Sequence, residues 1–270
     1  MPHAEANGIR MYYELHGEGE PLVLIMGTGC DHTLWALQLR DYTKEHRCLI
    51  FDHRGIGLSD APETPYTVRL MAEDTAALMR AVGIERAHIG GLSLGSLIGQ
   101  ELALNEPAMV HTLALHSTYA DGPRLPHLRF QMQVRRRLLE IGDRDLMALN
   151  SATWLFSASF QNAHPELVEL AIARSRQRLE TQPLTPVIRQ YEADLLHDTA
   201  DRLRRIACPT LVTVGSEDQI TLPSYSRRVH ELIPGSEFHL FPQGGHLALM
   251  EQADEFNRVT LDFMRRHPMA

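Results

Sequence analysis

The sequence predicts an α/β fold, with a mostly parallel central sheet that is flanked by helices. Short apolar runs, such as Leu22 to Met26, alternate along the chain with helical patterns. This alternation is typical of parallel strands joined by crossover helices. The run Leu22 to Met26 is apolar at every position, as expected for a strand that is buried on both faces of a sheet. The chain has 270 residues, 44% of them hydrophobic, and is long enough to bury a large core.

The first part of the chain follows this plan element by element. Asn7-Gly8 predicts the two-residue turn of a hairpin whose second strand is Ile9 to His16. Gly83 and Pro107 mark the ends of two helices. The strands expected next are Leu22 to Met26, Cys48 to Phe51, Ala87 to Gly91 and Val110 to His116. The helices expected between them are Leu34 to His46, Val68 to Val82 and Leu94 to Asn105.

Residues 121–201 contain no strand pattern, so we expect an all-helical insertion after the sixth strand. Its four helical patterns are Leu128 to Ile141, Asp145 to Leu155, Pro165 to Leu179 and Pro186 to Leu196. The alternation then resumes with strand Thr210 to Val214, helix Ser224 to Leu232, strand Glu237 to Phe241 and helix Asp254 to Arg266. The predicted core therefore consists of residues 1–120 and 202–270.

Composition and charge exclude several classes of function. The formal net charge is −8 and the one basic run is Arg135 to Arg137, which argues against nucleic acid as a partner. The amino terminus has no basic segment followed by an apolar one, so we expect a cytoplasmic protein that does not span a membrane. Cys30, Cys48 and Cys208 form no C-x-x-C pair, and the 15 histidines form no H-E-x-x-H motif. We therefore expect neither a disulfide framework nor a metal site.

Ser93 lies between Gly91 and Gly95 in the sequence HIGGLSLGSLIGQELAL. A G-x-S-x-G pattern occurs by chance in roughly one chain in ten of this length, so its context decides its meaning. Here the serine follows a predicted strand and precedes a predicted helix, as a nucleophilic serine does on a tight strand-to-helix turn. The amide of Leu94, at the start of that helix, is then a candidate donor to an oxyanion.

A serine hydroxyl needs a base and an orienting carboxylate to act as a nucleophile. His246 follows the last predicted strand in FPQGGHLALME. It is favoured over His239, which lies within a predicted strand, and over His267, which lies near the end of the chain. The preceding strand is followed by Glu217 and Asp218 in VGSEDQITLP. Either carboxylate could orient the histidine, and Asp218 could instead cap a helix.

Three further segments carry a resemblance to the α/β-hydrolase family. LIMGTGCDHTLW places Met26, Gly27 and Trp35 where the family has His-Gly and a later Trp, and FDHRGIGLSD matches the family's Phe-Asp-x-Arg-Gly-x-Gly-x-Ser. The third segment matches the family's acid-bearing pattern through Pro209, Thr210, Leu211, Val212, Gly215, Asp218 and Pro223. The resemblance covers essentially the whole chain and implies an α/β-hydrolase fold whose helical insertion, residues 121–201, is a cap.

The resemblance also implies roles for individual residues. Ser93 would be the nucleophile, His246 the general base and then acid, and Asp218 the orienting carboxylate. The backbone N–H groups of Thr28 and Leu94 would form the oxyanion hole. Met26 departs from the family pattern, in which a histidine is usual at this turn.

The predicted function is a cofactor-independent serine hydrolase that cleaves a small to medium, partly apolar carboxylic ester or lactone. The substrate is expected to be a small molecule, and enol-lactones or acyl-lactones fit as well as simple esters. Trp154, Phe156 and Phe160 in the cap would either pack the cap or line an acyl pocket. A cofactor-free perhydrolase or haloperoxidase with the same triad, and a ligand receptor with slow turnover, remain as alternatives. The oligomeric state is left open.

Overall fold

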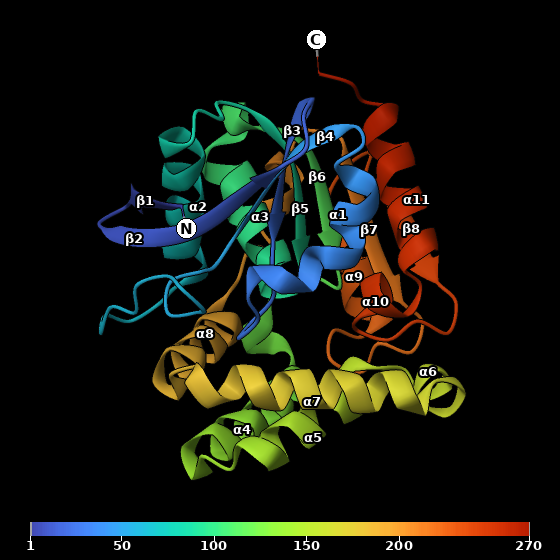
Figure 1. Ribbon diagram of the computed structural model, residues 1–270. Coiled ribbons are helices and arrows are strands. Elements are labelled where there is room, and N and C mark those ends of the chain that lie inside the picture. The colour runs from blue at the N-terminus through green and yellow to red at the C-terminus, as the bar shows by residue number, and fades with distance from the viewer. Residues whose placement is uncertain (1, 270) are drawn as a thin grey trace.

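The computed structural model describes residues 2–269, and its centre is an eight-stranded sheet in the order β1-β2-β4-β3-β5-β6-β7-β8 (Figure 1). The strands are β1 (His3–Ala6), β2 (Ile9–His16), β3 (Glu20–Ile25), β4 (His46–Phe51), β5 (Ala87–Leu92), β6 (Val110–His116), β7 (Thr210–Gly215) and β8 (Glu237–Phe241). β2 runs antiparallel to both β1 and β4, whereas β3 to β8 run parallel to one another. The predicted mostly parallel sheet is therefore confirmed.

The hairpin between β1 and β2 turns at Asn7 and Gly8, as the sequence predicts. Both residues have positive φ, 51° and 78°. A two-residue turn of this kind needs positive φ at both central positions, which asparagine and glycine adopt at the lowest cost.

Helices cover both faces of the sheet. The helices of the core are α1 (Ala36–Tyr42), α2 (Val68–Ala81), α3 (Leu94–Asn105), α9 (Pro223–Leu232), α10 (Ala248–Glu251) and α11 (Ala253–Arg265), with 3₁₀ turns at His32–Trp35, Pro107–Met109 and Leu203–Arg205. Leu22 and Leu24 of β3 belong to the apolar cluster with α1 and α11. Val23 and Ile25, which alternate with them, belong to the cluster with α2, α3 and α9. The continuous apolar run of this strand is thus explained by burial on both faces.

The helix predicted from Leu34 to His46 is wrong at both ends. The chain first forms the 3₁₀ turn His32–Trp35, and α1 already ends at Tyr42. His46 is the first residue of β4, where it pairs with Glu20 of β3. The start of β4 is set by its pairing with β3, which is distant in the sequence. The periodicity of apolar residues in a helix contains no information about such pairing.

Five helices, rather than the four predicted, lie between β6 and β7. They are α4 (Pro126–Ile141), α5 (Arg144–Leu155), α6 (Ala158–Ala163), α7 (Pro165–Thr181) and α8 (Leu184–Leu196), and a 3₁₀ turn at Gly122–Arg124 precedes them. In Figure 1 they form a layer at one end of the sheet, which we call the cap. The additional helix, α6, has six residues, too few to show a periodic pattern, and its start is capped by the Ser157 side chain. The division into core and cap at residues 121 and 201 stays a prediction.

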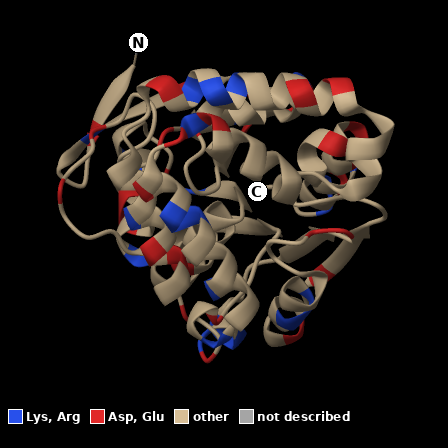
Figure 2. Cartoon of the chain, turned by 90° about the horizontal axis from the view of Figure 1, so that it is seen from below, with Lys and Arg blue, Asp and Glu red and all other residues tan. Residues whose placement is uncertain are grey.

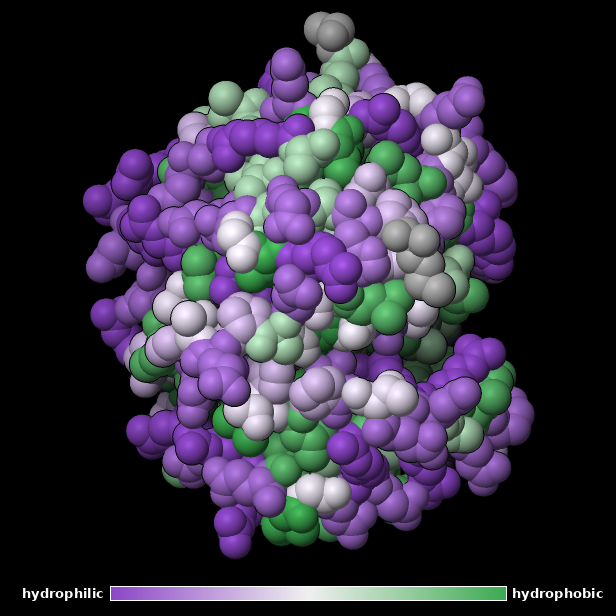
Figure 3. All heavy atoms as spheres, turned by 60° about the vertical axis from the view of Figure 1, so that its left-hand side comes forward, coloured by the Kyte–Doolittle hydropathy of each residue, from purple (hydrophilic) through white to green (hydrophobic). Residues whose placement is uncertain are grey.

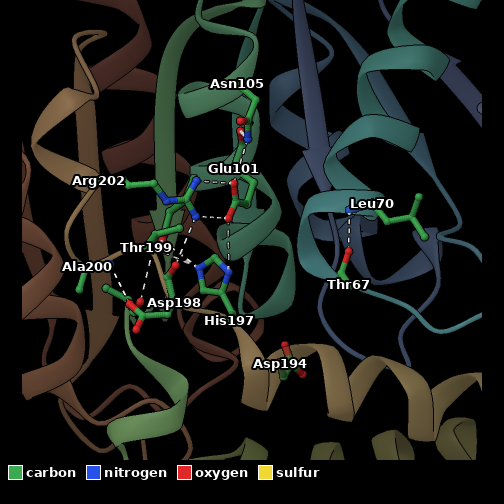
Figure 4. A network of polar contacts seen from close by, with 12 residues as sticks. Thr67, Leu70, Glu101, Asn105, Asp194, His197, Asp198, Thr199, Ala200 and Arg202 are labelled. Atoms are coloured by element: carbon green, nitrogen blue, oxygen red, sulfur yellow. Dashed lines mark hydrogen bonds and ion pairs between the residues drawn. The ribbon is translucent and has the colours of Figure 1, made fainter.

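The chain returns from the cap to the core through a polar network on α3 (Figure 4). Arg202 forms two hydrogen bonds to the carboxylate of Glu101, at 2.5 and 3.0 Å, and Asn105 donates to the same carboxylate at 2.9 Å. His197 and Thr199 contact the side-chain oxygen of Gln100. Because α3 directly follows Ser93, these contacts attach the end of the cap to the helix next to the candidate nucleophile.

The surface has charges of both signs side by side (Figure 2), as in the pairs that Arg258 forms with Glu255 and Asp262. The face in Figure 3 is mainly hydrophilic, with smaller apolar areas. Leu146 and Leu167 are among the partly exposed apolar side chains of the cap. In the described part of the chain, no helix combines the length and the hydropathy that crossing a bilayer requires.

Candidate active site

Ser93 lies at the junction between β5 and α3 in a conformation that few residues adopt. Its φ is 54° and its ψ is −120°, a strained geometry that costs of order 1–3 kcal/mol and is typical of functional sites. A Cβ on Gly91 would overlap the carbonyl oxygen of Gly95, and a Cβ on Gly95 would overlap the carbonyl oxygen of Ile25. Both flanking positions therefore require glycine, which explains why the pattern is G-x-S-x-G.

Asp218 and His246 form a buried pair beside this junction. His246 Nδ1 lies 2.9 Å from Asp218 Oδ2, and the two side chains are 4% and 0% exposed. Asp218 also accepts hydrogen bonds from the amides of Ile220 and Thr221 and from the Thr221 hydroxyl, at 2.8–3.0 Å. Burial alone raises the pKa of Asp218, but the attraction of His246 and these hydrogen bonds outweigh it and hold the pKa below its ordinary value. A carboxylate that stays ionised can orient the imidazole.

The neighbouring carboxylate, Glu217, points to a different partner. It accepts hydrogen bonds from the amide of Ser159 at 3.1 Å and from the Ser159 hydroxyl. The geometry therefore favours Asp218 over Glu217 as the orienting group, because the alternative carboxylate is engaged with the cap.

Ser93 follows β5 and His246 follows β8, and the residues at the end of β6 contact the backbone of both. The Ser93 amide donates to the carbonyl of His116 at 2.9 Å, and the next residue, Ser117, donates its hydroxyl to the carbonyl of His246 at 3.4 Å. Within residues 2–269, no hydrogen bond joins the Ser93 hydroxyl to the His246 ring. Catalytic hydrogen bonds often tighten only when substrate binds. The structure thus joins Asp218 to His246 directly and connects His246 to Ser93 through backbone contacts with His116 and Ser117.

The two predicted oxyanion donors are both available. Gly27 lies against Ser93, since a Cβ there would be 3.3 Å from Ser93 Cβ. Among the described residues, neither the Thr28 amide nor the Leu94 amide donates a hydrogen bond to a protein group. Met26, which replaces the family's usual histidine, is buried, and its carbonyl accepts from His53 Nε2 at 2.9 Å. The turn is thus supported by a histidine from the loop after β4 rather than by a histidine of its own.

The cap holds the turn that carries Thr28. The Thr28 hydroxyl donates to Asp194 Oδ2 at 2.5 Å, and the Gly29 amide donates to Gln190 Oε1 at 2.8 Å, both from α8. Arg178 of α7 donates to the Gly29 carbonyl. The sequence offered no signal for these contacts, because cap and turn lie more than 140 residues apart.

Asp194 is a buried carboxyl group with an unusually high pKa. Its side chain lies on α8, below the network of Figure 4. Burial raises its pKa from 3.8 to about 7, although the Thr28 hydroxyl and the charge of Arg135 act in the opposite direction. Its Oδ1 has no hydrogen-bond partner in residues 2–269. At neutral pH, an uncompensated negative charge therefore begins to form inside the protein.

Replacing Asp194 with asparagine is expected to stabilise the protein more at pH 8 than at pH 5. A carboxyl group whose folded pKa is raised contributes stability below its unfolded pKa, and this contribution is lost as the pH rises through the folded value. Between pH 5 and 8 the wild type should therefore lose about 2–3 kcal/mol of unfolding free energy relative to D194N, for a pKa of 3.8 unfolded and about 7 folded. Urea unfolding at both pH values measures the difference, with D198N, a partly exposed neighbour, as the control. Parallel pH curves for wild type and D194N would contradict the prediction.

Glu251 connects the loop of His246 to the cap. Its carboxylate accepts hydrogen bonds from the amide and hydroxyl of Ser157, at 2.8 and 2.7 Å, and from the Gly245 amide at 3.0 Å. The amide of Leu247 donates to the carbonyl of Leu155 at 3.0 Å. His246 is therefore flanked on both sides by residues that are hydrogen-bonded to the cap or to Glu251.

E251Q is expected to lower the unfolding free energy by about 1–3 kcal/mol, because a glutamine amide cannot accept all three hydrogen bonds and leaves buried donors unpaired. The same substitution should lower kcat/KM, since the loop of His246 loses one of its connections to the cap and keeps only that of Leu247 to Leu155. Urea unfolding and ester hydrolysis measure the two effects. E255Q, a change of the same chemistry on the surface of α11, serves as the control and should leave both unchanged.

The three predicted substrate-binding side chains have different surroundings. Phe156 is buried in the apolar cluster that also contains Met26, Leu92 and Leu247. Phe160 stacks on Phe156 with 5.5 Å between the ring centroids. Trp154 is partly buried on α5. The cluster places Phe156 among residues that are next to Gly27, Ser93 and His246 in the sequence, so part of this aromatic group lies close to the candidate site.

The matches to known proteins extend over nearly the whole chain. A family model described as alpha/beta hydrolase fold matches residues 20–253. A protein of Azorhizobium caulinodans, named as a provisional carbamate hydrolase, RutD, is 30% identical over 267 residues, 97% of this chain and 98% of that protein. The enol-lactonase from Burkholderia xenovorans LB400 has a similar structure, with a TM-score of 0.87, 27% identity and coverage of 97% of this chain and 99% of its own. A thermophilic esterase from Thermogutta terrifontis reaches a TM-score of 0.87 at 28% identity and covers 99% of both chains. The chain belongs to the alpha/beta hydrolase family, and it is a hydrolase.

Proposed function

We propose that this protein is a serine hydrolase that cleaves a small to medium, partly apolar carboxylic ester or lactone through an acyl-enzyme. The observation that carries the proposal is the strained conformation of Ser93 between two glycines that tolerate no side chain. The buried pair of Asp218 and His246 supports it, since a serine needs such a base.

The proposed reaction has two halves. His246 takes the proton of the Ser93 hydroxyl while the oxygen attacks the carbonyl carbon, and the amides of Thr28 and Leu94 bind the negative oxygen that forms. His246 then gives its proton to the leaving alkoxide, which in a lactone stays attached to the acyl group. In the second half, water attacks the acyl-enzyme with His246 again as the base, and Ser93 is released. Asp218 holds the ring and stabilises its charged form throughout.

The apolar cluster around Phe156 supports a substrate with an apolar acyl part, and the similar structures include an enol-lactonase and an esterase. A carbamate is a second candidate. The relative that is named as a carbamate hydrolase favours this candidate. Asp194 favours it too, because its buried carboxyl group accepts a hydrogen bond from the Thr28 hydroxyl and so adds a polar group beside the proposed oxyanion hole.

A panel of short-chain and long-chain esters, lactones, acyl amides and carbamates, incubated with wild type and S93A, tests the proposal. We expect hydrolysis of esters or lactones by the wild type and none above background by S93A. Faster hydrolysis of carbamates than of esters would select the second candidate. Peracid formation from acetate and hydrogen peroxide would indicate a perhydrolase. Stoichiometric retention of a ligand without turnover would instead indicate a receptor.

A further inference from the structure

A cluster of metal-binding side chains lies at the edge of the sheet opposite Ser93. Glu20 and His46 are the first residues of β3 and β4, and His88 is the second residue of β5. β3 lies between the other two strands in the sheet. The three residues each offer one ligand atom, and these atoms all lie within 4.8 Å of one another. His88 and Ser93 are five residues apart along β5, which corresponds to about 16 Å.

Among the described residues, no hydrogen bond of normal geometry reaches either nitrogen of the His46 ring, although the backbone of Glu20 lies close enough to act on it. The residue is 4% exposed. Its ring meets that of His88 edge to face, with 5.4 Å between the centroids. A buried polar group without a partner costs free energy and calls for an explanation. A cation bound by one of its nitrogens would provide that partner.

His88 is oriented as a metal ligand would be. Its Nε2 lies 2.9 Å from Glu20 Oε2, and its Nδ1 lies 2.8 Å from the Thr112 hydroxyl. The hydroxyl can donate to Nδ1 or accept from it, so the proton can move to Nδ1 and leave Nε2 free to bind a cation. A hydrogen bond from the second ring nitrogen commonly fixes histidines that bind metals.

We propose that Glu20, His46 and His88 form a binding site for a divalent transition-metal ion, with Zn²⁺ the ion that fits best. Two imidazoles and one carboxylate are a common ligand set for zinc, which binds them at about 2.0–2.2 Å and completes a tetrahedron with water. Ligand atoms in such a tetrahedron lie about 3.3 Å apart. The Glu20 side chain is 34% exposed, which gives the ion a path from solvent. Its Oε1 accepts a hydrogen bond from the Met269 amide at 2.9 Å, so Oε2, which faces His88, is the oxygen that would bind the ion. The expected effect of the ion is to join three strand ends, far from the proposed reaction.

Zinc binding to the protein without a histidine tag tests the proposal. The protein is freed of metal with a chelator, incubated with ZnCl₂, dialysed and analysed by mass spectrometry for metal. We expect about one zinc per chain in the wild type, and less than a tenth of that in E20Q and H46L. T112V should bind about 10- to 100-fold more weakly, because it loses the group that orients His88. H164Q, a change at an exposed histidine of the cap, is the matched control and should bind like the wild type.

A second readout separates a defined site from adventitious binding. Co²⁺ in place of zinc should give the intense visible absorption of a tetrahedral complex in the wild type, and this absorption should be lost in E20Q and H46L. Circular dichroism and thermal melting of the metal-free variants show whether they fold. Absence of stoichiometric zinc in the wild type, or a full equivalent of zinc in either folded variant, would overturn the assignment. Hydrolysis of the panel substrates should change less than about twofold with zinc, so either proposal can fail without the other.

Discussion

S93A is expected to lower kcat for the best substrate by about 10⁶-fold, because alanine removes the atom that attacks the carbonyl. A residual acceleration over the reaction in water should remain, since the oxyanion donors and the binding surface are unchanged. Initial rates over a range of substrate concentrations measure the effect. S224A, which removes an exposed hydroxyl at the start of α9, is the control.

The same variant should lose all labelling by a fluorophosphonate, which reacts with an activated serine. S224A should be labelled like the wild type. Labelling of S93A at full strength would place the nucleophile elsewhere in the chain and would remove the basis of the proposed function.

D218N is expected to lower kcat by about 10⁴-fold with little change in KM. Asparagine has nearly the same shape but presents one acceptor instead of two and carries no charge, so it no longer holds His246 in the required tautomer or stabilises the imidazolium. Steady-state kinetics on the same substrate provide the measurement.

E217Q is the matched control, because Glu217 is the neighbouring carboxylate and binds Ser159 of the cap instead. Its kcat should stay within about tenfold of the wild type. A larger loss in E217Q than in D218N would show that Glu217, and not Asp218, orients the base.

Most of the core could be predicted because its signals are local. The Asn-Gly turn and the strands that are apolar on both faces need only a few neighbouring residues to be seen. The strand-turn-helix around Ser93 is also local, and the glycines on both sides are required by contacts with chain segments that every such junction brings together. Element ends set by pairing between distant strands, such as the start of β4 at His46, were wrong for that reason.

The candidate site was predicted in its members more than in its geometry. Asp218 and His246 could be named because both follow strands, and the ends of parallel strands meet at one edge of the sheet. The residues alone left Asp218 and Glu217 open, and the family resemblance favoured Asp218. The structure adds the physical reason, since the two adjacent carboxylates point to different partners. Thr221 donates a hydrogen bond to the Asp218 carboxylate. Nothing in the sequence indicated this contact except that Thr221 has a hydroxyl group and lies three residues after Asp218.

By itself, the sequence determined the α/β core, the helical nature of the cap and the position of Ser93 on its strand-to-helix turn. These features depend on side-chain periodicity and on glycine, both of which act over a few residues. Only the tertiary structure decided that Asp194 and Gln190 hold the turn of Thr28, that Glu251 connects His246 to the cap, and which side chains meet at the opposite edge of the sheet. The physical reason is the same in each case: burial, pairing and charge compensation depend on groups that are distant in sequence and become neighbours only when the chain folds.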